Sequence, residues 1–241
     1  MTQSGMAYND VNENGLLDLD VYFDFLCPFS YQAAAWVRQV AELMGPEVIS
    51  VRWRFLSIEQ FSKSKDNQGW NIWDQKPDSS EVKGLLPFLA GGVAHAAGGE
   101  QALSKFYEVL GRMRHEEGLS IWERGIIEKA WQEAGLDASL LQGVFDGSDR
   151  RGYEKLQNDH TEAVQKYNAF GTPTLVFEES RAFFLKLMPR PEATDEALEL
   201  FQHLQRLAMG FRHGVLEFKR PLTEEQEAEV NSMKSKSTQG L

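Results

Sequence analysis

The only cysteine of the chain, Cys27, lies between a predicted strand and a predicted helix. Residues 17–25 alternate between polar and apolar side chains, as a half-buried strand does. Residues 29–44 are typical of a helix, which ends before a Gly-Pro pair. Pro28 takes the first helical position, where the missing N–H costs nothing. The sequence therefore predicts a strand–turn–helix junction with a thiol at the start of the helix.

A thiol at this junction faces unpaired backbone N–H groups and the positive end of the helix dipole. Both favour the thiolate over the thiol, so we expect a lowered pKa and a nucleophilic Cys27. The alternative is an inert buried cysteine, which is the commoner fate of a lone Cys. One cysteine cannot form an intramolecular disulfide, which fits a reducing compartment. It can accept a small thiol, but no second cysteine can release the product.

The elements that follow predict a mixed α/β fold. Residues 47–56 form a second strand with Val51, Trp53 and Phe55 on one face, which completes a βαβ unit with parallel strands. Residues 58–80 indicate a long loop with a short helix, and four helices are predicted over 82–97, 99–116, 121–134 and 137–145. The remaining predicted elements are a helix over 150–168, a hairpin of strands 175–177 and 182–185, an amphipathic helix over 193–209 and a short apolar segment at 214–218.

This order, β-α-β, helices, then α-β-β-α, predicts a thioredoxin-like fold with an inserted all-helical domain. The thioredoxin-like domain covers residues 16–57 and 150–222, and the helical insertion covers 58–149. Residues 1–15 and 223–241 are expected to be flexible termini.

Charge and motifs exclude several classes of function. The chain carries 25 basic and 36 acidic residues, a net charge of −11, which disfavours nucleic acids and anionic membrane surfaces as partners. The polar N-terminus does not resemble a signal peptide, and no apolar run reaches the ~20 residues of a membrane span. We therefore expect a cytoplasmic protein. The histidines have no metal-ligand spacing, so no metal site is predicted.

Two segments resemble a known family. Residues 23–30, Phe-Asp-Phe-Leu-Cys-Pro-Phe-Ser, are similar to the active-site segment of the DsbA superfamily, and residues 171–174 are similar to its cis-proline loop. That superfamily includes kappa-class glutathione transferases, 2-hydroxychromene-2-carboxylate isomerases and DsbA-like reductases. Segments 111–118, 170–174 and 216–220 also resemble the mycothiol-dependent nitroreductase branch, in the same order. The resemblance covers about residues 18–222.

The resemblance assigns roles to several residues. It implies a cis bond between Thr172 and Pro173, with the proline against the thiol and the Thr172 backbone free to pair with an extended thiol substrate. An ordinary trans turn is the alternative. Ser30 replaces the second cysteine that redox-active relatives usually carry. Its hydroxyl either hydrogen-bonds the Cys27 thiolate or has no role. Pro28 completes the catalytic turn.

Three further residues are candidates for thiol or substrate contacts. Phe29 belongs to the same turn. Asp24, three residues before Cys27, is either a buried proton acceptor or a strand-end acid that caps a nearby N–H. His115 is either an acid/base or substrate contact from the insertion, or a cation at a helix C-terminus.

The sequence thus predicts a DsbA-like thiol oxidoreductase with Cys27 as a monothiol nucleophile. We expect no tightly bound cofactor, but a low-molecular-weight thiol (glutathione, mycothiol or bacillithiol) as co-substrate. The substrate is a small molecule or a thiol protein, and the resemblance allows a homodimer. One alternative is a kappa-type glutathione transferase or isomerase, which activates the bound thiol without being modified. The other is a redox-inactive binding or chaperone-like protein.

Overall fold

The computed structural model describes residues 15–178, 181–210 and 222–238 of the chain. The apolar segment predicted at 214–218 lies outside this part of the chain. Four strands form one sheet in the order β2-β1-β3-β4, and they are β1 (Leu17–Phe23), β2 (Ile49–Phe55), β3 (Thr174–Phe177) and β4 (Arg181–Phe184). β1 and β2 are parallel, and β3 runs antiparallel to both of its neighbours. The predicted βαβ unit and hairpin are therefore confirmed.

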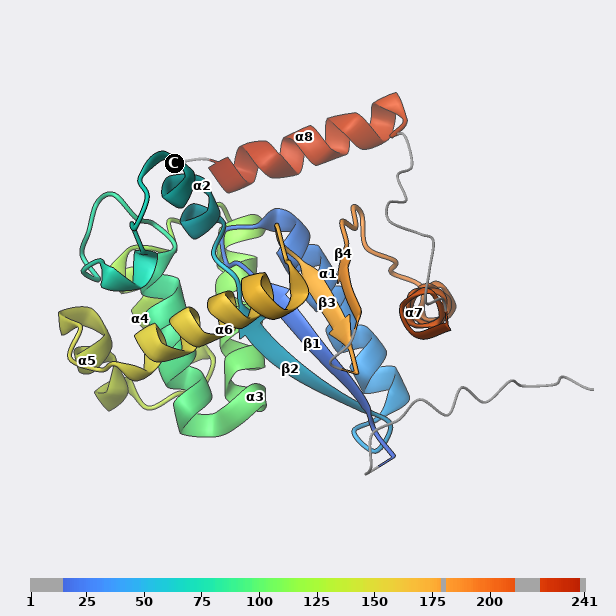
Figure 1. Cartoon of the computed structure of the whole chain (residues 1–241), viewed down its shortest axis with the longest axis horizontal. Helices are drawn as coiled ribbons and strands as arrows, with labels where there is room; N and C mark the ends of the chain where they lie inside the picture. Colours follow the sequence, from blue (N-terminus) through green and yellow to red (C-terminus); the bar gives the residue numbers. More distant parts are fainter. Residues whose placement is uncertain (1–14, 179–180, 211–221, 239–241) are drawn as a thin grey trace, which may run out of the picture.

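Helices cover both faces of the sheet because apolar side chains emerge from both faces of β1. One face packs against α1 (Pro28–Met44) and α7 (Thr194–Gly210), where Trp36 and Phe201 are fully buried. The Trp36 indole N–H donates to the Ala197 carbonyl oxygen at 3.1 Å and links these two helices. The other face carries Tyr22 and Val176, which lie under α6 (Arg151–Tyr167). Figure 1 shows α6 crossing the sheet, with α7 beyond β4.

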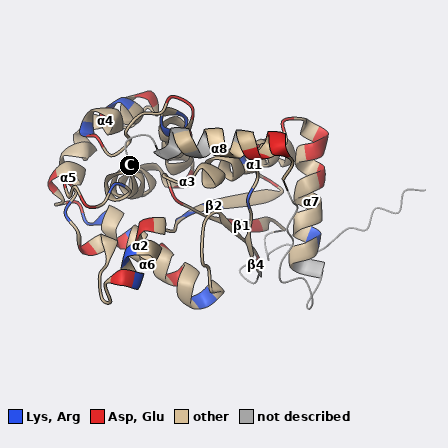
Figure 2. Ribbon diagram, turned by 90° about the horizontal axis from the view of Figure 1, so that it is seen from above, with Lys and Arg blue, Asp and Glu red and all other residues tan. Residues whose placement is uncertain are grey.

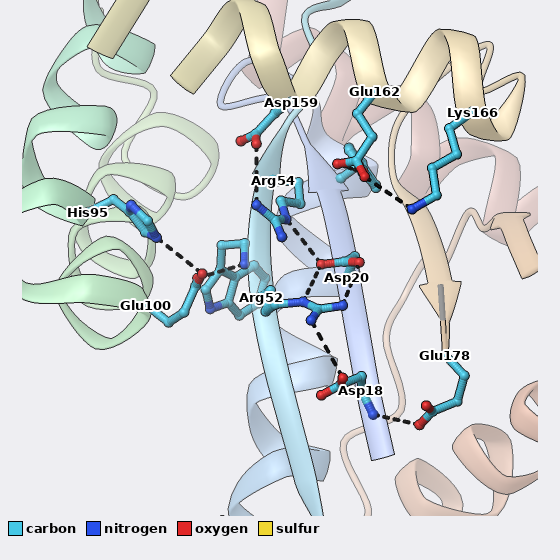
Figure 3. A network of polar contacts seen from close by, with 12 residues as sticks. Asp18, Asp20, Arg52, Arg54, His95, Glu100, Asp159, Glu162, Lys166 and Glu178 are labelled. Atoms are coloured by element: carbon cyan, nitrogen blue, oxygen red, sulfur yellow. Dashed lines mark hydrogen bonds and ion pairs between the residues drawn. The ribbon is translucent and has the colours of Figure 1, made fainter. Parts of the chain in front are cut away.

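Ion pairs replace apolar contacts on part of the α6 face. Arg52 lies directly opposite Asp20 in the parallel register, and its guanidinium donates to both Asp20 carboxylate oxygens at 2.7 and 3.0 Å. Arg54 also reaches Asp20, at 3.1 Å, and lies 3.5 Å from Asp159 on α6 (Figure 3). Arg52 and Arg54 thus lie on the face opposite Trp53, and the ion pairs link β1, β2 and α6.

The segment between β2 and α6 is helical, as predicted. Its elements are α2 (Ile58–Asp66), η1 (Ile72–Asp74), α3 (Leu85–His115), α4 (Arg124–Glu133), η2 (Ala138–Leu140) and α5 (Leu141–Asp146). The two helices predicted over 82–97 and 99–116 are confirmed as the two halves of α3, whose backbone is non-helical at Gly98 and Gly99, and Gly99 has a positive φ of 66°. One cluster of buried apolar side chains extends from β1 through α3 to α4. The insertion therefore shares its core with the sheet.

The C-terminal tail contains a helix that the sequence analysis did not predict. α8 (Glu224–Thr238) begins with three acidic residues in its first turn and shows almost no amphipathic pattern. Its charged sequence gave no apolar stripe from which a helix could be inferred. In the ranges that the structure describes, no helix is long and apolar enough to cross a membrane.

The insertion and α6 meet through two glycines. A Cβ atom on Gly152 of α6 would lie 2.5 Å from the Leu89 carbonyl oxygen of α3, and one on Gly92 would lie 2.5 Å from the Gly152 Cα. Both obstacles are backbone atoms, which cannot rotate away as a side chain can. Only glycine at these positions allows the two helices to approach this closely.

We expect Gly152→Ala to destabilise the protein by about 1–3 kcal/mol, because the methyl group forces α6 away from α3. Gly125→Ala is the matched control. Gly125 lies in α4, and a Cβ atom there would have no neighbouring atom within 4 Å, so alanine should stabilise that helix by up to about 1 kcal/mol. Urea unfolding followed by tryptophan fluorescence measures both changes. A Gly152→Ala protein as stable as the wild type would contradict the close contact.

Candidate active site

Cys27 occupies the junction that the sequence predicted. It is the N-cap of α1, with an extended backbone (φ −87°, ψ 115°), and Pro28 follows in the first turn. Its backbone N–H donates to the Asp24 carbonyl oxygen at 3.1 Å, which closes the turn after β1. The residue is 7% exposed and counts as buried. The thiol therefore lies at the start of a helix, held by a tight turn.

The loop before β3 brings the second half of the site to Cys27. The Thr172–Pro173 peptide bond is cis, and so is Met188–Pro189, which the sequence analysis did not single out. The Cys27 Sγ atom lies 3.5 Å from the Thr172 carbonyl oxygen. The Thr172 hydroxyl is buried and has no hydrogen-bond partner among the described residues. The thiol thus contacts a backbone carbonyl group from a segment distant in sequence.

Asp24 has features of both alternatives that the sequence left open, since it is a buried acid and it also caps nearby N–H groups. Its carboxylate is buried and accepts the Leu26 N–H at 2.8 Å and the Ile58 N–H at 2.7 Å, so it caps two backbone donors. Burial raises its pKa to about 7, and the nearby Glu59 carboxylate adds to this, although the two N–H donors act in the opposite direction. A carboxyl group that changes protonation near neutral pH therefore lies in the turn that carries the thiol.

Ser30 and Phe29 belong to the first turn of α1. Ser30 is fully buried, and its hydroxyl oxygen accepts the Asp24 backbone N–H at 3.4 Å. In the described part of the chain, no hydrogen bond joins Ser30 to the Cys27 sulfur. Phe29 is half-buried, and the Lys186 ammonium lies 4.9 Å from the centre of its ring. Ser30 thus braces the turn, whereas Phe29 lies at its rim.

His115 links the helical insertion to the active-site turn. It is the last residue of α3, and its Nε2 atom lies 3.0 Å from the Phe25 carbonyl oxygen, two residues before the cysteine. Burial lowers its pKa to about 4. The imidazole is therefore neutral at pH 7, and the proposed helix-terminal cation is wrong. A neutral ring donates one N–H, and the Phe25 carbonyl is the acceptor that fits Nε2.

Several residues that pack near the active-site turn were not indicated by the sequence, among them Tyr31, Glu116 and Tyr107. Tyr31 stacks on the His115 ring with centroids 5.2 Å apart, and its hydroxyl donates to Glu116 at 2.6 Å. Tyr107 is fully buried, and its hydroxyl has no hydrogen-bond partner among the described residues. Burial raises the pKa of Tyr107 well above its ordinary value. In a sequence, a helical tyrosine near an active site cannot be distinguished from a tyrosine of the hydrophobic core.

The side chains around the thiol do not form a metal centre. Within the described ranges, no three His, Cys, Asp or Glu side chains lie close enough together to hold a metal ion. The arrangement instead combines one thiol, one buried carboxyl group and backbone groups from two loops. Such a set suits nucleophilic chemistry at sulfur, in which a thiolate attacks and protons move to and from nearby groups.

Several solved structures are similar to this chain in fold. A 2-hydroxychromene-2-carboxylate isomerase is 17% identical, with a TM-score of 0.55, and the match covers 79% of this chain and 95% of the isomerase. The cytosolic disulfide reductase DsbM from Pseudomonas aeruginosa with GSH is 18% identical, with a TM-score of 0.54 and coverage of 78% and 99%. A probable DsbA oxidoreductase from Streptomyces coelicolor is 16% identical, with a TM-score of 0.55 and coverage of 84% and 94%. These likenesses establish the fold.

Sequence comparisons give the family. An uncharacterized protein from Mycobacterium tuberculosis is 26% identical over 205 residues, which cover 84% of this chain and 81% of the relative. The model of the DSBA-like thioredoxin domain matches residues 18–199, which include both the cysteine turn and the cis-proline loop. The resemblance to the mycothiol-dependent nitroreductase branch stays a prediction. The chain therefore belongs to the DsbA-like thioredoxin-domain family.

Proposed function

We propose that this protein is a thiol oxidoreductase in which Cys27 acts as a single nucleophile and a low-molecular-weight thiol supplies the second sulfur. The observation that carries the proposal is the position of the only cysteine, at the N-cap of α1 and 3.5 Å from the carbonyl oxygen before a cis proline. The positive end of a helix dipole favours negatively charged groups, which supports a nucleophilic role for a cysteine at an N-cap.

The proposed exchange has two steps. The Cys27 thiolate attacks one sulfur of a disulfide, a new S–S bond forms, and the other sulfur leaves as a thiolate with the bonding electron pair. A free small thiolate then attacks the mixed disulfide on the small-thiol side, which restores the Cys27 thiolate and yields a new disulfide. The second thiol must come from solution because the chain holds no other cysteine.

Neighbouring residues have distinct roles in this proposal. The Thr172 backbone pairs with the extended part of the bound thiol, and its unpartnered hydroxyl is available as a donor. Asp24 takes up or releases the proton that accompanies conversion between thiol and thiolate, since its pKa of about 7 suits proton exchange at neutral pH. His115 positions the turn through the Phe25 carbonyl.

A second candidate is a kappa-type transferase or isomerase, in which the small thiol is activated without modification of the protein. Structural likeness to a 2-hydroxychromene-2-carboxylate isomerase favours it, as does the serine at position 30. A reducing compartment such as the cytoplasm supplies the small thiol in either case, and a thioredoxin-fold binding protein is the outcome if neither activity is found.

Exposure to glutathione disulfide should add one glutathione unit to Cys27, because the thiolate attacks the disulfide and no internal thiol removes the adduct. Intact-mass spectrometry detects the adduct, and excess glutathione should remove it. Cys27→Ser is the matched control and should stay unmodified. An unmodified wild-type protein would contradict the proposed exchange and favour the transferase.

Ser30→Cys should convert the site into one that resolves its own adduct. Ser30 lies one helical turn after Cys27 and replaces the resolving thiol of redox-active relatives. After reaction with glutathione disulfide, the variant should release the small thiol and lose two hydrogens as an internal disulfide forms. Persistence of the glutathione adduct at wild-type levels would show that the two positions cannot bridge.

Asp24→Asn should remove a pH dependence of stability. The folded-state pKa of Asp24 lies above its unfolded value, so the folded protein binds the extra proton and stability falls as pH rises from about 4 to 7. The loss attributable to this group approaches roughly 1.4 kcal/mol per pH unit. Urea unfolding of both proteins at several pH values gives the difference, and parallel curves for wild type and variant would contradict the raised pKa.

A further inference from the structure

One lysine lies against the rim of the active-site turn. The Lys186 ammonium is 4.9 Å from the centre of the Phe29 ring and 5.2 Å from that of Phe184. The residue before it, Leu185, donates its N–H to the Pro173 carbonyl oxygen at 3.1 Å. Lys186 therefore follows directly on the strand that pairs with the cis-proline loop, and it lies over the first turn of α1.

Aromatic rings hold this ammonium without neutralising it. A cation over a ring face is attracted by the ring quadrupole and keeps its full charge. Lys105 and Lys155, by contrast, each lie within 3.0 Å of a carboxylate. Among the residues that the structure describes, Lys186 has no carboxylate oxygen within 4.0 Å. Its charge is therefore available to a ligand.

A second cation lies on the same connection between β4 and α7. Arg190 donates to the Gln32 side chain at 3.1 Å, in the second turn of α1, and it also has no carboxylate within 4.0 Å among the described residues. The chain as a whole carries a net charge of −11, and acidic residues mark α7 and α8 in Figure 2. Two cations that contact the first two turns of α1 therefore run against the overall charge of the molecule.

The surface beside Lys186 is exposed. Phe170, two residues before Thr172, is 72% exposed, and its ring lies 5.0 Å from that of Phe184, which is 37% exposed. Lys186 itself is exposed. A small molecule that reaches Cys27 from this side therefore meets an aromatic surface with a positive charge at its edge.

We propose that Lys186, assisted by Arg190, forms a subsite for carboxylate groups, and that the small-thiol co-substrate is therefore an anionic, carboxylate-bearing thiol. This inference rests on the proposed function, since it names the class of thiol that the same site uses. Glutathione and bacillithiol carry carboxylates, whereas mycothiol does not. The subsite thus favours the first two over the third.

The test compares disulfides of different charge. Second-order rate constants for modification of Cys27 are measured with glutathione disulfide (anionic), hydroxyethyl disulfide (neutral) and cystamine (cationic). Lys186→Met should slow the anionic reagent by about 1.5- to 5-fold, the range for one exposed ion pair, and leave the neutral reagent unchanged. Lys186→Glu should slow the anionic reagent further and accelerate cystamine. Added salt should reduce the difference in the wild type.

Lys129→Met is the control for the loss of one charge anywhere on the molecule, since Lys129 is exposed on α4. It should change none of the three rates. A loss of rate with the anionic reagent that is equal in Lys129→Met and Lys186→Met would overturn the subsite and indicate a general effect of net charge.

Alkylation separates this proposal from the proposed function. With iodoacetate (anionic) and iodoacetamide (neutral), the Cys27 thiolate displaces iodide in the same way, so the ratio of the two rates reports only the charge near the thiol. Lys186→Met should lower that ratio, and an unchanged ratio would overturn the subsite. A wild-type protein that reacts with both alkylating reagents but with none of the three disulfides would instead overturn the proposed function.

Discussion

Hydrogen bonds between side chains and backbone groups fix the short turn from which the only thiol of the chain projects. The Asp24 carboxylate accepts the Leu26 and Ile58 N–H groups, the Ser30 hydroxyl accepts the Asp24 N–H, and His115 contacts the Phe25 carbonyl oxygen. These bonds tie the end of β1 to the start of α2 and to the end of α3. The cysteine, the first turn of α1 and the approach of the cis-proline loop all depend on this turn.

The same hydrogen bonds show how the helical insertion contributes to the candidate active site. α3 ends at the residue that contacts the turn, and its first half, before the kink, makes the close backbone contact with α6. A buried imidazole serves here because it is neutral and offers a single N–H to a carbonyl group. The buried carboxyl group of Asp24 also holds the turn. Burial disfavours its charged form and therefore raises its pKa.

Much of the fold could be predicted from the periodicity of apolar residues and from the positions of glycine and proline. Alternating residues predicted β1 and β2, and the lone cysteine before a proline predicted the start of α1, because these signals are local. The Gly98-Gly99 pair likewise predicted the break between the two halves of α3, where the backbone leaves helical geometry. Helix α8 has no apolar stripe and gave no signal. Cys27, Thr172 and Pro173 were brought together as family resemblance implied, but the neutral state of His115 depends on burial, which a sequence does not display.

The single cysteine at the start of α1 also determines which property of a thiol pool the proposed site can follow. A protein with two active-site thiols releases two small thiols for each disulfide that it consumes, so its oxidised fraction varies with the disulfide concentration divided by the square of the thiol concentration. Cys27 alone would release one small thiol for each disulfide that it consumes. Its thiolated fraction would therefore vary with the simple ratio of disulfide to thiol concentration. Equal dilution of the small thiol and its disulfide would shift the equilibrium of the two-thiol protein and leave that of Cys27 unchanged.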